Sequence, residues 1–517
     1  MVSLLGQYRR VLLRAILVVF ALTGLTYSTN HHIPSLLAWS EKASDPGVPL
    51  FRAVKLGSEL ASHTLIQYAR ENQRLHWLAL LAEMNIAEAQ YSLGMLTTSK
   101  SVRSRMLNLA AQQDHLGALF ELGQTSPDEG SKTRAFTRAS ELGHQPSQYA
   151  LYQWFWMQEE YGLALPWLKK VANRHGPSAL LLARYLWKNE QPQEAKRYFQ
   201  LAHELGEQEA KSYLSLIKSY WKKPPLLNDN HANWVTRQCA MKLQFVANSL
   251  ESIKQAVAFK AQFLKDKRLQ SLPICINEPV WFDKNTLSCE HFAINDYRLS
   301  CDVGALAKAF LPGDFTHTVI FAEQGKANVN NGIMYLDLAD KYSVFVHELA
   351  HFAGFVDEYP VSEGLSERIC EPGQSHPNIL VRSLPKQRDA AQLTEKEIEE
   401  GFFSDVDTLE ERRDEPELDI SYWQQFSNSL AMLKARTCNN HPNQAYKFVG
   451  KMTFMEFHDQ EYIPEMYINI WRARLNSPHL LVPASLNIAH ALEDKGDFKK
   501  AEKWRTHFIQ FRQGLLH

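Results

Sequence analysis

The chain of 517 residues has no surplus of positive charge: 56 Lys and Arg stand against 57 Asp and Glu, and the formal net charge is −1. Without basic residues to offset phosphate, we do not expect a nucleic-acid partner. No Cys-x-x-Cys pair occurs, so a zinc site built from thiolates is not expected either. Hydrophobic residues make up an ordinary 45%, which indicates folded domains rather than a largely disordered chain.

Long apolar runs are also scarce, and the one that matters lies near the N-terminus. Residues 15–25 are apolar apart from Thr and Gly and follow three arginines within residues 9–14. This arrangement predicts either a signal peptide cleaved after Ser28 or a membrane anchor that is kept, and we favour the anchor. Basic residues ahead of the run send the rest of the chain out of the cytoplasm, to the periplasm or the extracellular space. A buried helix of a cytosolic protein is the remaining alternative.

Cysteines are absent from both ends of the chain. An even number confined to one part of an exported chain predicts three disulfides and a domain over about residues 236–440. Spacing does not determine the pairing, although residues 287–290 and 299–302 could face each other as the arms of a hairpin. The six cysteines are Cys239, Cys275, Cys289, Cys301, Cys370 and Cys438.

Within that domain one segment reads His-Glu-Leu-Ala-His-Phe-Ala-Gly-Phe-Val-Asp-Glu-Tyr. His347 and His351 are four residues apart, so on a helix both imidazoles project from one face toward one metal ion. Glu348 then lies beside the metal, where a carboxylate can take a proton from bound water. Gly354 permits a sharp turn after the helix, and Asp357 returns as a third ligand. The alternative is a core helix whose histidines only satisfy hydrogen bonds, but two His and an acid on one buried face are costly without a metal.

These five residues match the extended zinc signature of the metzincin peptidases, His-Glu-x-x-His-x-x-Gly-x-x-His/Asp. The Asp variant resembles that of the snapalysin-type enzymes. The Asp-Glu-Tyr ending is similar to that of the IgA-peptidase family, whose pattern has one more residue between the second His and the Asp. The resemblance implies an α+β zincin-type peptidase domain with one Zn²⁺ held by His347, His351 and Asp357, and with Glu348 as the general base.

The chain departs from the metzincins in one respect. Those enzymes carry a Met in a tight turn below the metal, and here no Met follows Asp357 before Met432. Residues 376–380 resemble such a turn with Leu in the Met position. Tyr359 and His376 are candidates for stabilising the oxyanion, and their alternative roles are packing and a turn.

Other residues compete for the place of third ligand. Glu358 is adjacent to Asp357, and three further glutamates lie where other zincins bring a glutamate from a following helix: Glu363, Glu367 and Glu371. Three protein ligands leave the fourth zinc position open for water, which Glu348 deprotonates during attack on a peptide carbonyl.

Two short strands are predicted ahead of the metal-binding helix, over residues 316–322 and 332–338, since both are rich in β-branched and aromatic residues. A turn-forming loop over residues 327–332 separates them. At the edge of such a sheet an extended peptide pairs through its main chain, so side-chain preference stays open.

An internal repeat precedes the domain. Residues 88–94 align with 117–123, and residues 140–147 align with 203–210, which gives a period near 30 residues. The pattern over about residues 75–222 resembles a Sel-like array of the tetratricopeptide class, made of stacked helix pairs with a concave face for a protein partner. An irregular helical bundle with accidental similarity is the alternative.

The tail is helical again. Residues 486–504 resemble a tetratricopeptide helix pair, with the turn at Gly496–Asp497 and Pro483 at the start. The sequence thus predicts a multidomain chain of helical-repeat segments and an α+β peptidase. Its parts are a targeting segment over 1–30, a repeat domain over 31–235, the peptidase over 236–440 and C-terminal helices over 441–517.

The function that we expect is an exported zinc endopeptidase coupled to a repeat module, with a peptide or protein substrate and a protein partner on the repeats. If the N-terminal segment is not cleaved, the membrane is a further partner. The main alternative is a repeat-protein interaction scaffold in which the zinc site is structural or inactive. A third is a hydrolase acting on a non-peptide amide such as cell-wall material, which would use the same catalytic residues.

Overall fold

The computed structural model describes residues 31–223, 239–291, 298–372, 376–382 and 420–515. The chain divides into two compact units, Met1–Lys211 and Ser212–His517, and each is considered by itself. The predicted targeting segment 1–30 lies outside the described residues. Within the described ranges no helix is both long and apolar enough to cross a membrane.

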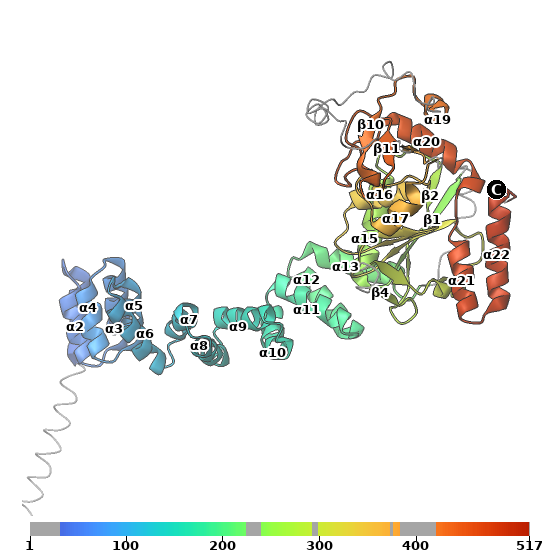
Figure 1. Cartoon of the computed structure of the whole chain (residues 1–517). Helices are drawn as coiled ribbons and strands as arrows, with labels where there is room; N and C mark the ends of the chain where they lie inside the picture. The colour runs from blue at the N-terminus through green and yellow to red at the C-terminus, as the bar shows by residue number, and fades with distance from the viewer. Residues whose placement is uncertain (1–30, 224–238, 292–297, 373–375, 383–419, 516–517) are drawn as a thin grey trace, which may run out of the picture. The chain divides into compact units, whose positions relative to one another are not determined.

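The first unit is made entirely of short helices in its described part (Figure 1). Each helix packs against the next one along the chain. The predicted repeat is confirmed at this level: helices of similar length alternate with tight turns. After a helical stretch over residues 31–42, the helices are α2 (Gly47–Lys55), α3 (Glu59–Glu71), α4 (Leu75–Glu83), α5 (Ala87–Leu96), α6 (Lys100–Gln112), α7 (Leu116–Thr125), α8 (Glu129–Glu141), α9 (Gln145–Met157), α10 (Tyr161–Ala172), α11 (Gly176–Lys188) and α12 (Pro192–Glu204). Helix α13 (Gln208–Tyr220) crosses the boundary between the units.

Two recurring residue types explain the regularity of the first unit. His115 and His175 stand at the N-caps of α7 and α11, where each imidazole accepts a hydrogen bond from a backbone amide of the first turn. Gly123 lies where α7 meets α8, and a Cβ atom there would be 2.6 Å from the ring of Phe136. A small residue at this crossing is therefore required for the two helices to approach each other.

The second unit contains a mainly parallel sheet in the order β2-β1-β6-β8-β7, with β3 also paired to β1. Only β7 runs antiparallel, along the edge formed by β8. Two smaller sheets lie apart from it, β4-β5 and β10-β11-β9. The bounds are β1 (Met241–Ala247), β2 (Ile274–Ile276), β3 (Val280–Trp281), β4 (Cys289–His291), β5 (Leu299–Cys301), β6 (His317–Phe321), β7 (Asn328–Asn330), β8 (Ile333–Leu336), β9 (Ile379–Arg382), β10 (Leu433–Ala435) and β11 (Gln444–Lys447).

Both faces of the main sheet are covered, as a parallel sheet requires. On one face lie α15 (Leu250–Phe263) and α16 (Tyr342–His351): the ring of Phe245 in β1 is 5.6 Å from that of Phe345 in α16. On the other face, Ile320 of β6 shares a core with Ile488 and Trp504. Those two residues belong to α21 (Ser485–Asp494) and α22 (Phe498–Arg512), which follow α20 (Glu465–Leu475). The two strands predicted before the metal-binding helix are β6 and β8, and the loop predicted between them also contains the short strand β7.

The C-terminal helices form the expected pair, but they do not stand apart from the metal-binding region. The amide of Ala484 donates to the Thr316 carbonyl at the start of β6, 2.8 Å away, and a Cβ at Gly332 would be 2.1 Å from the Ala484 nitrogen. Residues 441–517 therefore complete the core of the second unit, whereas the sequence analysis separated them from residues 236–440. The difference arises because the face of the sheet opposite α15 and α16 is buried largely by α21 and α22, together with residues 303–310.

All six cysteines form disulfides, as expected from their number. The pairs are Cys239–Cys275, Cys289–Cys301 and Cys370–Cys438. Cys289 and Cys301 face each other across the β4-β5 hairpin, as the sequence suggested.

Candidate metal centre

Helix α16 presents two opposite faces with different roles. Phe345 and Leu349, four residues apart, are fully buried and pack toward the sheet. His347, Glu348 and His351 project elsewhere, and their candidate ligand atoms lie within 4.8 Å of one another. The spacing predicted from the sequence therefore produces the expected cluster.

Asp357 joins this cluster from the turn that follows the helix. Gly354 has a φ of +81°, a left-handed conformation that glycine adopts without strain and that reverses the chain. One carboxylate oxygen of Asp357 then lies 3.0 Å from Nε2 of His347 and 3.3 Å from Nε2 of His351. The structure thus brings together the four residues that the sequence analysis assigned to the site.

The other ring nitrogen of each histidine is held by a backbone carbonyl. Nδ1 of His347 donates to Phe454 O at 2.9 Å, and Nδ1 of His351 donates to Phe355 O at 2.8 Å. These bonds place a proton on each Nδ1, so that Nε2 faces Asp357 and is the ring nitrogen that would bind a metal. Two oriented imidazoles and a carboxylate are a donor set that suits zinc, and carbonyl acceptors of this kind usually support metal-binding histidines.

The charges of the cluster are strongly coupled. Burial on its own would lower the pKa of His351, but the Asp357 carboxylate beside it prevails and raises that pKa to about 9. Burial likewise opposes ionisation of Asp357, yet the charge of His351 and hydrogen bonds from both histidines hold the pKa of Asp357 well below its usual range. The site therefore keeps a carboxylate ionised in a largely buried position, where positive charge is needed to balance it.

Tyr359 lies against the cluster. Its ring stacks on that of His347 with centroids 6.2 Å apart. Burial, together with the carboxylates of Asp357 and Glu348, raises the pKa of its hydroxyl, so the group stays protonated and able to donate a hydrogen bond. The other candidate for stabilising the oxyanion is His376. Its Nε2 already donates a hydrogen bond to the Ile369 carbonyl at 3.0 Å.

The four glutamates considered as alternatives to Asp357 for the third ligand lie elsewhere in the structure. Glu358 is fully buried and faces away from the histidines, where it accepts hydrogen bonds from the side chains of Asn378, Thr453 and Tyr467. The ammonium of Lys447 is 3.4 Å from the same carboxylate. The remaining three, Glu363, Glu367 and Glu371, are exposed in or just after α17 (Glu363–Ile369). None of the four contributes to the cluster of His347 and His351.

Sequence reasoning missed the turn that supports His347. Residues 453–456 form this turn, with the amide of Glu456 donating to Thr453 O at 3.1 Å. Met455 in it is fully buried, and Phe454 supplies the carbonyl that orients His347. The segment expected to be such a turn, residues 376–380, instead leads into β9, which pairs with β11. The only available signal was a methionine almost a hundred residues after Asp357, beyond the range in which a local motif can be recognised.

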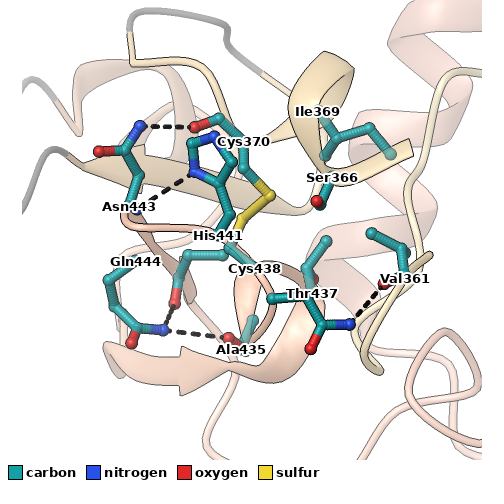
Figure 2. Close-up of a disulfide and its surroundings, with 12 residues drawn as sticks. Val361, Ser366, Ile369, Cys370, Ala435, Thr437, Cys438, His441, Asn443 and Gln444 are labelled. Carbon is teal, nitrogen blue, oxygen red and sulfur yellow. Dashed lines mark hydrogen bonds between the residues drawn. A yellow bond between two sulfur atoms is a disulfide. The ribbon is translucent and has the colours of Figure 1, made fainter. Parts of the chain in front are cut away.

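The disulfide Cys370–Cys438 fastens the loop that carries Asp357 (Figure 2). Next to Cys438, the hydroxyl of Thr437 donates to the Asp357 carbonyl at 2.6 Å, and the Thr437 carbonyl accepts from the Val361 amide at 3.3 Å. On the other side of the bridge, Nδ2 of Asn443 donates to Cys370 O at 2.9 Å. The loop that carries Asp357 is therefore tied on both sides to a cross-linked segment.

A cleft with a volume of about 1150 Å³ opens over the cluster. Glu348, His351, Asp357 and Tyr359 contribute to its lining. Strand β7 lies along one side, and helix α17 along another. The cleft is large enough for several residues of a peptide and is lined by three of the four clustered residues, Glu348, His351 and Asp357, whereas His347 lies buried behind them.

Comparison with known proteins gives little further information. No protein-family model matches the chain, and no curated protein is similar to it. Among solved structures, it is similar to c5321, a protective antigen of uropathogenic Escherichia coli with an SLR fold: identity is 17% over 38% of this chain and 50% of that protein, at a TM-score of 0.28. It is also similar to a Sel1 repeat protein from Oxalobacter formigenes, with 18% identity over 37% of this chain and 94% of that protein, at a TM-score of 0.24.

The chain thus spans half the length of the first of these proteins. At these TM-scores the likeness carries no argument about activity, substrate or partner.

Proposed function

We propose that the chain is a zinc-dependent hydrolase that cleaves peptide bonds. The observation that supports this proposal is the convergence of His347, His351 and Asp357 beneath an open cleft that Glu348 also lines. Three protein ligands with access from solvent are the pattern of a catalytic zinc, because a structural zinc normally has four protein ligands.

Each residue has a separate task in this proposal. A zinc ion held there would act as a Lewis acid and lower the pKa of its bound water to about 7. Glu348 would act as the general base there, taking a proton from the attacking water and giving it to the leaving amine. Tyr359, whose hydroxyl stays protonated, donates a hydrogen bond toward the carbonyl oxygen on which negative charge develops. Phe454 and Phe355 keep both imidazoles in the tautomer that binds metal.

Strand β7 gives the substrate a place to bind. Within the described residues it pairs only with β8, so its other edge remains available along the cleft. An extended peptide can pair with such an edge through its main chain, which favours peptides over other amides. We further propose that this chemistry takes place outside the cytoplasm, since the basic and apolar residues before residue 30 and the three disulfides fit an exported chain.

The second candidate function is a repeat-protein interaction scaffold with a structural or inactive zinc site. The helix pairs of the first unit support it, and it is the only one of the two functions that the comparisons touch, since both similar structures are repeat proteins. The two functions are compatible, because a partner bound by the repeats would bring substrate to the second unit. The hydrolase proposal rests on geometry alone.

The test is zinc content measured beside hydrolysis. We expect one zinc per purified chain and cleavage of a mixture of unstructured peptides. Glu348→Gln should keep the zinc but lose activity by about 10²–10⁴-fold, because only the proton acceptor is removed. Glu363→Gln, an exposed glutamate near the cleft, is the matched control and should change neither value.

A parent chain that binds no zinc, or a Glu348→Gln variant with full activity, would refute the hydrolase. A zinc-loaded chain that cleaves cell-wall amides but no peptide would assign the same residues to a different amide substrate.

A further inference from the structure

Two arginines line the cleft without any role in the proposed chemistry. Arg298 directly precedes β5, and Arg368 lies in α17, so they reach the cleft from separate parts of the second unit. Both side chains are exposed. A third cation, Lys326, also lies in the lining.

Neither arginine has an acidic partner in the part of the chain that the structure describes. Among the residues that the structure describes, neither Arg298 nor Arg368 forms an ion pair. Among the described residues that line the cleft, the acidic ones are Glu348 and Asp357, and both belong to the candidate metal centre. If a divalent ion is bound, its charge balances these two carboxylates. The guanidinium groups of Arg298 and Arg368 then give the described lining a net positive charge, whereas Glu363, Glu367 and Glu371 lie outside it, on or just after α17.

A positive cleft next to a reacting centre selects among substrates. Low-dielectric walls focus the potential of charges that line a cleft, so anionic groups are attracted and cationic groups are repelled. A guanidinium is also the side chain best suited to bind a carboxylate, because its planar donors match the two carboxylate oxygens. Main-chain pairing with β7 does not distinguish anionic from cationic peptides, so this selection depends on the arginine side chains.

We propose that the cleft recognises peptide segments that carry carboxylates close to the bond placed over the metal centre, through Arg298 and Arg368. The carboxylate can come from Asp or Glu side chains or from the C-terminus of the substrate. This inference specifies the substrate class of the proposed hydrolase. It predicts binding as well as cleavage, so it can be tested separately.

Binding is measured with the full chain carrying Glu348→Gln, so that cleavage does not consume the probe. The probes are fluorescein-labelled peptides of one length and one Ala-rich backbone, with Glu, Gln or Lys at the same two positions. Each is made with a free or an amidated C-terminus. We expect the Glu peptide to bind about tenfold more tightly than the Gln peptide at low salt, with the Lys peptide weakest and the difference reduced at high salt.

Charge reversal identifies the residues responsible. Arg298→Glu and Arg368→Glu should each remove most of the roughly tenfold preference for Glu, and the double variant should favour Lys. Lys308→Glu is the matched control, since this lysine is exposed on η2 (Val303–Lys308), outside the lining of the cleft, and brings the same change in net charge. Arg298→Gln and Arg368→Gln repeat the test with smaller perturbation in case the reversed charges impair folding.

The outcomes are distinct. Equal binding of the Glu, Gln and Lys peptides, or a Glu preference that survives in both arginine variants, would overturn the inference. A preference that follows the free C-terminus rather than the side chains supports carboxylate recognition and identifies the chain end as its source. A Glu preference that depends on the arginines in a chain that binds no zinc supports the inference and refutes the hydrolase.

Discussion

The two units of this chain differ in the sequence separation of the residues that contact each other within each unit. Between neighbouring repeats, side-chain hydrogen bonds join residues 18 to 28 positions apart, as from Gln113 to Gln90 and between His115 and Glu88. Around the candidate metal centre the corresponding separations are 80 for Thr437 and Asp357, and 107 for His347 and Phe454. The first unit is thus built from local interactions that recur, whereas the second depends on single contacts between distant segments.

This difference determines what a substitution can do in each unit. In a repeat array each helix pair contacts only its neighbours. A substitution in one pair therefore lowers stability locally, and the neighbouring pairs bear part of the loss. In the second unit one contact orients one ligand, and no copy of it exists elsewhere. The following predictions test this contrast, in order of decreasing effect.

The largest effect is expected at the third ligand. Asp357→Ala removes the carboxylate that meets both imidazoles, and zinc affinity should fall by more than about 100-fold, beyond the loss typical for residues that only support a ligand. Competition with a chelator of known affinity measures this. Glu363→Ala, which removes a competing glutamate, should leave the affinity unchanged; an equal loss in both variants would reassign the third ligand.

The buried carboxylate beside the ligand should come next. Glu358→Ala leaves the partners Thr453, Tyr467 and Lys447 without their common acceptor, and we expect the free energy of unfolding to fall by about 3–5 kcal/mol. Because Thr453 begins the turn that orients His347, zinc affinity should also fall by about 10–100-fold.

Denaturant unfolding and zinc titration of the same Glu358→Ala sample separate the two effects. The exposed Glu367→Ala serves as the control. A loss of stability with normal zinc affinity would mean that Glu358 supports the fold but not the ligands.

Removal of the Cys370–Cys438 disulfide should lower the free energy of unfolding by a slightly smaller amount. The double replacement Cys370→Ser with Cys438→Ser opens a loop of sequence separation 68 and should cost about 4 kcal/mol. Cys289→Ser with Cys301→Ser opens a separation of only 12 and should cost about 3 kcal/mol.

Zinc affinity provides the sharper distinction between the two bridges. It should fall only when Cys370–Cys438 is removed, because Thr437 beside that bridge holds the Asp357 carbonyl. Equal zinc affinity in both double variants would show that the hydrogen bond from Thr437 suffices without the cross-link.

The smallest effect is expected in the repeats. Gly123→Ala places a Cβ 2.6 Å from the Phe136 ring and should lower the free energy of unfolding by about 1–3 kcal/mol. Gly162→Ala in α10 meets no atom within 4 Å and should be neutral or stabilising by up to about 1 kcal/mol. Both variants should bind zinc normally. A loss of zinc in Gly123→Ala would contradict the separation of the two units.

The sequence could predict those parts of the structure that depend on neighbouring residues. Spacing was sufficient to place His347 and His351 on one face of a helix, because the helical period fixes which residues share a face. Gly354 indicated the turn, and the period near 30 residues indicated the helix pairs of the first unit. The β-branched residues of β6 and β8 marked both strands.

Contacts between distant segments could not be predicted. Glu358 and Asp357 are adjacent carboxylates, and nothing local distinguishes the residue that faces the histidines from the one that is buried against Tyr467. The turn at Phe454 was not recognised, because the tight turn was expected soon after Asp357 rather than almost a hundred residues later.

What the amino-acid sequence indicated by itself is the set of candidate ligands, the candidate general base and the repeated helix pairs, since each follows from the geometry of a single element or of its neighbour. Only the tertiary structure decided the pairing of the cysteines, the packing of α21 and α22 on the sheet, and the carbonyls that orient the two imidazoles. These depend on which segments come together when apolar surface is buried, and burial acts between surfaces regardless of their separation along the chain.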